Sequence, residues 1–92
     1  MSHPEQRVTA ADIAGGRVRC GVALKELLPK QQQLALKIVL RGITLECKWD
    51  PRDGSDRTRS GVLSVGKAPL QQLLKADEML TLEVIDGVPH FR

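Results

Sequence analysis

The sequence predicts the α+β class: a small, mostly antiparallel β-barrel with two short helices. Short segments in which apolar and polar residues alternate recur along the chain, separated by tight turn signals. Between them lie two stripes of leucines with helical spacing. With 92 residues, 41% of them hydrophobic and 27% charged, the chain has the size and composition of one soluble domain. Closing the strands into a barrel would protect the edges of so short a sheet.

The N-terminal residues are polar and show no apolar periodicity. We therefore expect a disordered lead-in over residues 1–8 and a single domain over residues 9–92. The lead-in lacks the apolar core of a secretory signal peptide. No apolar run approaches the length of a membrane span, so no membrane partner is expected.

A capping-box motif opens the predicted domain. Thr9 and Asp12 have the spacing in which each side chain bonds the backbone of the other, which predicts a helix of one or two turns. Gly15-Gly16 would end this helix. A short strand over Val8–Ile13 is the alternative, and the sequence does not decide between them.

A strand and a helix are predicted next. Arg17–Cys20 alternates with period two, so its arginines would point outward and its apolar residues inward. Gly21 ends this strand. Val22–Leu28 then carries a stripe of three leucines, which predicts a short helix that Pro29 stops.

The central hairpin has the strongest pattern. Leu34–Leu40 and Ile43–Trp49 both alternate, and Arg41-Gly42 between them is typical of a two-residue turn. The residues expected to face the core are Leu34, Leu36, Ile38, Leu40, Ile43, Leu45, Cys47 and Trp49.

The second half repeats the order of strand, helix and hairpin. The segments are Gly61–Val65, Ala68–Leu74, Met79–Ile85 and Val88–Arg92. Asp86-Gly87 is a strong signal for the hairpin turn. Pro89 cannot donate a backbone hydrogen bond, so the closing strand is expected at a sheet edge. The loose echo between the two halves favours a pseudo-symmetric barrel with helices at its ends.

A charged segment over residues 50–60 links the two halves. It holds as many aspartates as arginines, so it is locally neutral. Long loops in small domains often carry function. Arginine can pair with phosphate or with the edge of guanine through two hydrogen bonds. Contact with DNA, contact with a protein and a plain solvated loop are all compatible with this composition.

The net charge of +3 is mildly basic and compatible with nucleic acid. We expect the outward basic residues to dock on phosphates, and the charged segment to contact base edges. The candidate DNA-binding residues are Arg17, Arg19, Lys37, Arg41, Lys48, Arg52, Asp56, Arg57, Thr58, Arg59 and Ser60.

Two other uses of the chain stay open. Glu46 and Lys48 share one strand face, which is the local form of a metal-dependent nuclease signature, although only Asp12 precedes them as an acidic partner. The other is a protein-interaction or accessory module, using the charged segment or the edge of Val88–Arg92, within a larger protein.

Cysteine and histidine usage predicts no cofactor, no metal and no catalytic residue. Cys20 and Cys47 stand apart in alternating segments and are most simply small buried hydrophobes, in agreement with a cytoplasmic location. His3 and His90 lie near opposite ends of the chain and form no metal-ligand cluster with them.

The order of the elements, with the charged segment after the long hairpin, resembles the B3-like DNA-binding pseudobarrel. This domain occurs in plant transcription factors and in the recognition domains of some restriction endonucleases. The resemblance covers about residues 8–92 and implies a barrel that holds the major groove of double-stranded DNA between two arms. By position, the first arm corresponds to about residues 15–21 and the second to about residues 50–60.

Overall fold

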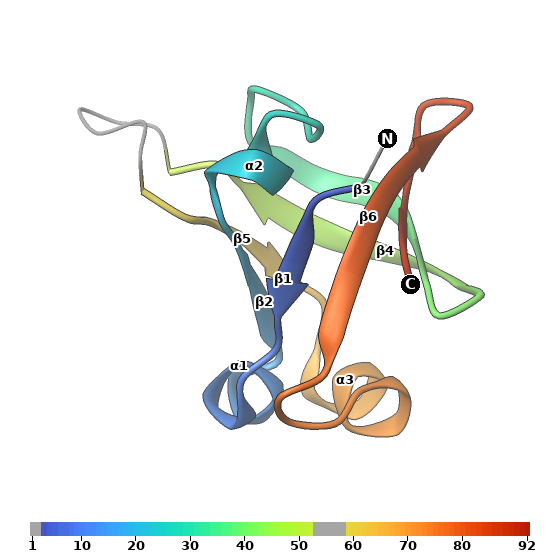
Figure 1. The fold of residues 1–92 in the computed structure, drawn as a ribbon. Helices are drawn as coiled ribbons and strands as arrows, with labels where there is room; N and C mark the ends of the chain where they lie inside the picture. The colour runs from blue at the N-terminus through green and yellow to red at the C-terminus, as the bar shows by residue number, and fades with distance from the viewer. Residues whose placement is uncertain (1–2, 53–58) are drawn as a thin grey trace.

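The computed structural model describes residues 3–52 and 59–92 (Figure 1). Over these residues the chain forms seven strands and three short helices, and the mixed sheet curls into a nearly closed barrel. The predicted fold class is confirmed. Among the described residues, no helix is long and apolar enough to cross a membrane.

From α1 onward the elements follow the predicted order. In chain order they are β1 (Glu5–Arg7), α1 (Ala10–Gly15), β2 (Arg17–Cys20), α2 (Val22–Lys25), β3 (Gln33–Leu40), β4 (Ile43–Asp50), β5 (Gly61–Ser64), α3 (Lys67–Leu73), β6 (Met79–Ile85) and β7 (Val88–Phe91). The strands lie in the order β1-β6-β7-β3-β4-β5-β2. All neighbouring strands are antiparallel except β3 and β7, which are parallel.

The N-terminal lead-in differs from its prediction. Residues 5–7 form β1, which pairs with β6 from Glu5 opposite Thr81 to Arg7 opposite Met79. Val8 follows, fully buried, and its backbone N–H donates to the carbonyl of Glu78 at 2.8 Å. The sequence conceals this strand because backbone bonds hold it on the sheet, while its own side chains stay mostly exposed.

The segment after Thr9, for which the sequence allowed either a helix or a short strand, forms the helix α1. Thr9 Oγ1 accepts a hydrogen bond from the Asp12 backbone N–H at 3.1 Å, and Asp12 Oδ2 accepts one from the Thr9 N–H at 3.3 Å. The helix ends at Gly16, whose φ of 71° is left-handed and suits glycine.

Both predicted hairpin turns are present. Arg41 and Gly42 have φ angles of 50° and 85°, and Asp86 and Gly87 have 52° and 78°. Positive φ at both central residues is the type I′ pattern, whose twist matches that of the flanking strands.

The central hairpin contains a β-bulge that the alternation did not predict. Gln33 pairs with Trp49 and Leu36 with Cys47, so Leu34 and Ala35 together face the single residue between those two on β4. The extra residue reverses the alternation at the start of β3. Leu34 is therefore 77% exposed, where the period-two pattern placed it in the core.

The closing strand also differs from its prediction. β7 lies between β6 and β3, inside the sheet, so Val88–Arg92 does not offer a free edge. Thr81 and Arg92 exchange both backbone bonds, which makes Val84 and Pro89 a pair that exchanges none. The register with β3 begins only at His90. Pro89 therefore occupies a position where the missing N–H removes no bond from either register.

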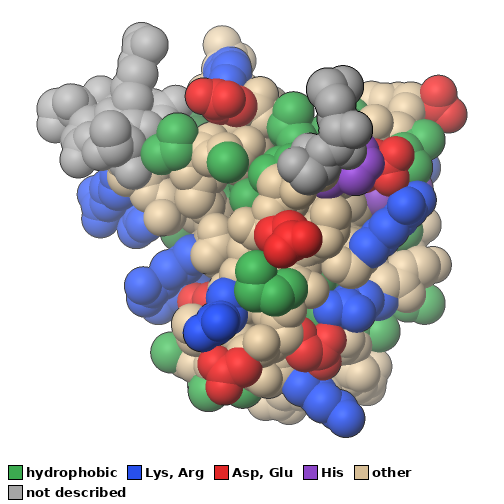
Figure 2. Space-filling model, viewed as in Figure 1, with side chains coloured by type: hydrophobic (Ala, Val, Ile, Leu, Met, Phe, Trp, Pro, Cys, Tyr) green, Lys and Arg blue, Asp and Glu red, His purple; other side chains and the backbone are tan. Residues whose placement is uncertain are grey.

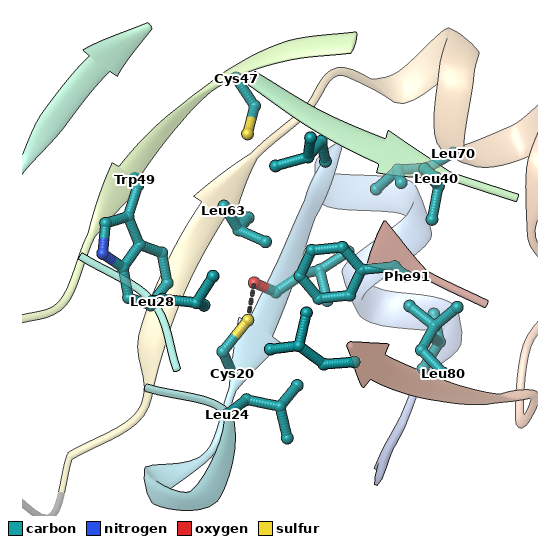
Figure 3. Packing of buried hydrophobic residues seen from close by; sticks show 14 of the residues in the cluster. Cys20, Leu24, Leu28, Leu40, Cys47, Trp49, Leu63, Leu70, Leu80 and Phe91 are labelled. Carbon is teal, nitrogen blue, oxygen red and sulfur yellow. Dashed lines mark hydrogen bonds between the residues drawn. The ribbon is translucent and has the colours of Figure 1, made fainter. Parts of the chain in front are cut away.

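The core fills the barrel with aliphatic residues around Trp49 and Phe91 (Figure 3). Trp49 is fully buried, and its indole N–H donates to the carbonyl of Pro29 at 2.8 Å. Cys20 and Cys47 are free and buried, as predicted. Burial raises the pKa of Cys20 to about 12 and that of Cys47 to about 11. Both thiols therefore remain protonated at neutral pH.

Candidate functional site

A row of exposed polar side chains crosses the outer face of β2, β5 and β4. Ser64 of β5 pairs with Arg17 on one side and with Lys48 on the other. Residues directly opposite in antiparallel strands share a face, and neighbouring strands lie about 4.8 Å apart. The backbones of Arg17 and Lys48 are therefore about 10 Å apart, with Ser64 between them.

The next row along the same strands is mixed in charge. Val62 of β5 pairs with Arg19 and with Asp50. Arg19 Nε lies 3.5 Å from Oδ1 of Asp12, whose side chain is only 5% exposed. The carboxylate of Asp12 thus partly offsets the charge of Arg19. Arg17 and Lys48, by contrast, flank the uncharged Ser64.

A groove of about 270 Å³ lies over these rows, with Arg17, Lys48 and Arg52 among its lining residues and Asp50 as its acidic member. Arg52 has a left-handed backbone, and its N–H donates to Asp50 Oδ1 at 2.9 Å, an Asx-type turn. Its Nε donates to the carbonyl of Ser60 at 2.8 Å. Arg52 therefore joins the two ends of the charged segment at the border of the groove.

A second groove, of about 530 Å³, adjoins the first. The two share Lys48 and Ser64 as lining residues. The second groove adds Lys67 at the start of α3, with Glu46 and the bulge residue Leu34. Lys67 was not among the predicted residues, because the sequence does not show that α3 begins beside β4 and β5.

Basic side chains lie on this side of the molecule, and others lie on the opposite side of the same view (Figure 2). Figure 2 shows Lys and Arg side chains along the left margin of the view, where β2 and β5 lie in Figure 1.

Glu46, which lines the larger groove, lies opposite Lys37 in the register of β3 and β4. Its negative charge therefore has a basic neighbour of its own on the same strand face.

The remaining predicted residues divide into three groups. Arg41 lies elsewhere, at the β3–β4 turn, where its Nη2 donates to Glu78 Oε2 at 2.8 Å and to the Met79 carbonyl at 3.4 Å. Arg59 is exposed, and its carbonyl accepts a bond from Lys25 Nζ at 2.6 Å. The third group lies outside the described residues: Asp56, Arg57 and Thr58.

The segment matched to the first arm is part of the sheet. Residues 15–21 comprise the end of α1, the turn at Gly16 and strand β2. The Gly16 carbonyl accepts bonds from the N–H groups of Val65 and Gly66, at 3.0 Å and 2.8 Å. Arg17 is therefore presented from a sheet face rather than from a projecting loop.

The nuclease alternative has little geometric support. Glu46 and Lys48 do line the same groove. Asp12, the acidic residue upstream of them, instead belongs to the capping box and faces Arg19. Within residues 3–52 and 59–92, no three His, Cys, Asp or Glu side chains come together as a metal site would require.

Comparison with known proteins gives no independent assignment. The chain matches no protein-family model, and no curated protein matches it closely enough to indicate a relative.

Proposed function

We propose that this chain binds double-stranded DNA without catalysing a reaction, and that the outer face of β2, β5 and β4 contacts the phosphates. The observation that carries the proposal is the row of Arg17, Ser64 and Lys48 beside Arg52. Arginine and lysine on an exposed, regular strand face suit a repeating anionic backbone. The resemblance to B3-like pseudobarrels implies the same class of ligand.

The proposed mechanism divides the work between two neighbouring parts of the surface. Phosphate contacts fix the register of a protein on DNA, while contacts to base edges carry the sequence information. Asp50 and Arg52 border the groove where the charged segment begins, and Arg52 also bonds Ser60 where it ends. A duplex held on the strand face would therefore lie beside the two described ends of the charged segment, to which we assign base contacts in the major groove.

Titration of a mixed-sequence duplex with the protein at several salt concentrations tests the proposal. Arg17→Ala and Lys48→Ala should each lower the slope of log affinity against log salt by about one unit. Lys75→Ala is the matched control, because Lys75 is an exposed lysine just beyond the C-terminal end of α3, lines neither groove and should leave the slope unchanged.

Wild-type protein that fails to bind duplexes, or binds them independently of salt, would refute the proposal. Capture of a protein partner that persists after nuclease treatment, by a surface that Arg17→Ala and Lys48→Ala disable, would assign the same face to protein recognition.

A further inference from the structure

Leu34 is the most exposed large apolar side chain in the described part of the chain. It is 77% exposed, whereas Ile43, the next in rank, is 48% exposed. Its position is a consequence of the β-bulge, since a regular register would turn this residue toward the core. Bulges often occur beside functional sites, where they redirect a side chain.

The exposed leucine lies at a groove of mixed lining, in which two lysines outnumber the single acidic residue, Glu46. Leu34 and Ala35 line the larger groove together with Lys48, Ser64 and Lys67. The groove continues into the first one through Lys48 and Ser64. An apolar contact in a groove that also holds two lysines is complementary to a nucleotide, in which an apolar sugar and base edge lie beside a charged phosphate.

We propose that the DNA backbone continues from the first groove into the second, where Lys48 and Lys67 contact phosphates and Leu34 packs against a sugar or a base edge. This inference rests on the proposed DNA binding and adds two residues to it, Leu34 and Lys67. The lysines supply the salt-dependent part of the affinity, and the leucine supplies a part that does not depend on salt.

The two roles give different signatures in one experiment. Leu34→Ala, Lys67→Ala and the wild type are titrated with the same mixed-sequence duplex over a range of salt. Leu34→Ala should weaken binding by about tenfold, with the salt slope unchanged, because the lost contact is apolar. Lys67→Ala should lower the slope by about one unit.

A matched control is available in the same hairpin. Ile43 is also exposed and apolar, and it directly follows the β3–β4 turn. Ile43 lines neither groove. Ile43→Ala should therefore leave affinity and slope unchanged. Because Leu34 has little contact with the core, fluorescence of the buried Trp49 should confirm that Leu34→Ala remains folded.

Failure of this inference is distinguishable from failure of the proposed function. If Arg17→Ala lowers the slope while Leu34→Ala and Lys67→Ala bind as the wild type does, the second groove is not used and DNA binding stands. If the wild type does not bind duplexes, both proposals fall. If Leu34→Ala leaves DNA binding intact but abolishes self-association in sedimentation, Leu34 serves a protein contact and the inference is wrong.

Discussion

The Trp49 ring occupies the space that a side chain at Gly61 would need. A Cβ built on Gly61 would overlap the indole ring. The two residues flank the charged segment, at the end of β4 and the start of β5. Their close packing brings the two ends of residues 50–60 together, and the Arg52–Ser60 bond lies just beyond them.

Gly61→Ala should destabilise the domain. The added methyl group must displace either the Trp49 ring or the backbone of β5, and overpacking of this kind costs about 1–3 kcal/mol. Denaturant unfolding followed by tryptophan fluorescence measures the change directly, since Trp49 is the sole tryptophan of the chain.

Gly15→Ala provides the control for that substitution. The three atoms nearest to a Cβ at Gly15 all belong to the Arg17 side chain, which can move, and the residue lies in α1, where alanine is favoured over glycine. Equal stability of Gly61→Ala and Gly15→Ala would show that the close contact with Trp49 does not constrain residue 61.

A side-chain bond links the two edges of the sheet. Gln6 of β1 accepts, through Oε1, a hydrogen bond from the Gly21 N–H at 3.0 Å, immediately after β2. Figure 1 shows these two edge strands beside each other. Gln6→Ala should cost about 0.5–1.5 kcal/mol and should speed hydrogen exchange at the Gly21 amide. Gln6→Glu retains the acceptor and should restore slow exchange; equal exchange rates in all three proteins would show that the bond does not hold the edges together.

Local chemistry explains the parts of the fold that the sequence predicted. The turn at Asp86-Gly87 depends on the backbone angles of those two residues, and the cap of α1 depends on the side chains of Thr9 and Asp12. Both features involve residues close together in the sequence, so a short stretch of sequence is enough to predict them. Alternation likewise placed Ile38 and Leu40 in the core, because the register is regular over that part of β3.

The features that the sequence missed depend on pairing between distant residues. The exposure of Leu34 follows from a bulge, which only the register against β4 reveals. Pro89 can lie in an interior strand because the registers of β7 with β3 and β6 require no hydrogen bond from its backbone nitrogen. The candidate site has the same origin, since β5 brings Arg17 and Lys48 together across a long sequence separation.

Arg19 should contribute less to DNA binding than Arg17, although both were predicted as equals. Asp12 lies 3.5 Å from Arg19 and offsets its charge. Arg19→Ala should therefore lower the salt slope by less than Arg17→Ala does. Asp12→Asn keeps an acceptor for the Thr9 N–H while removing the charge, so it should strengthen duplex binding, and Arg19→Ala should cancel that gain. Equal slopes for the two arginine variants would contradict the assigned role of Asp12.

The buried thiols make stability depend on pH in the alkaline range. Burial raises the pKa of Cys20 from 9.0 to about 12. Above pH 9 the unfolded chain loses this proton while the folded protein keeps it, so the unfolded state binds fewer protons and the free energy of unfolding falls as pH rises. The loss approaches about 1 kcal/mol per pH unit for Cys20 and continues until the pH reaches the folded pKa. Below pH 9 both states hold the proton, and this thiol contributes no slope.

Denaturant unfolding of the wild type and of Cys20→Ala at pH 8, 9, 10 and 10.5 measures this dependence. The two proteins differ only at this residue, so the difference between their pH profiles isolates the thiol. Cys20→Ala should be less stable at pH 8, because it loses packing, and should lose stability less steeply above pH 9. Parallel pH profiles for the two proteins would mean that the Cys20 thiol ionises as readily in the folded barrel as in the unfolded chain.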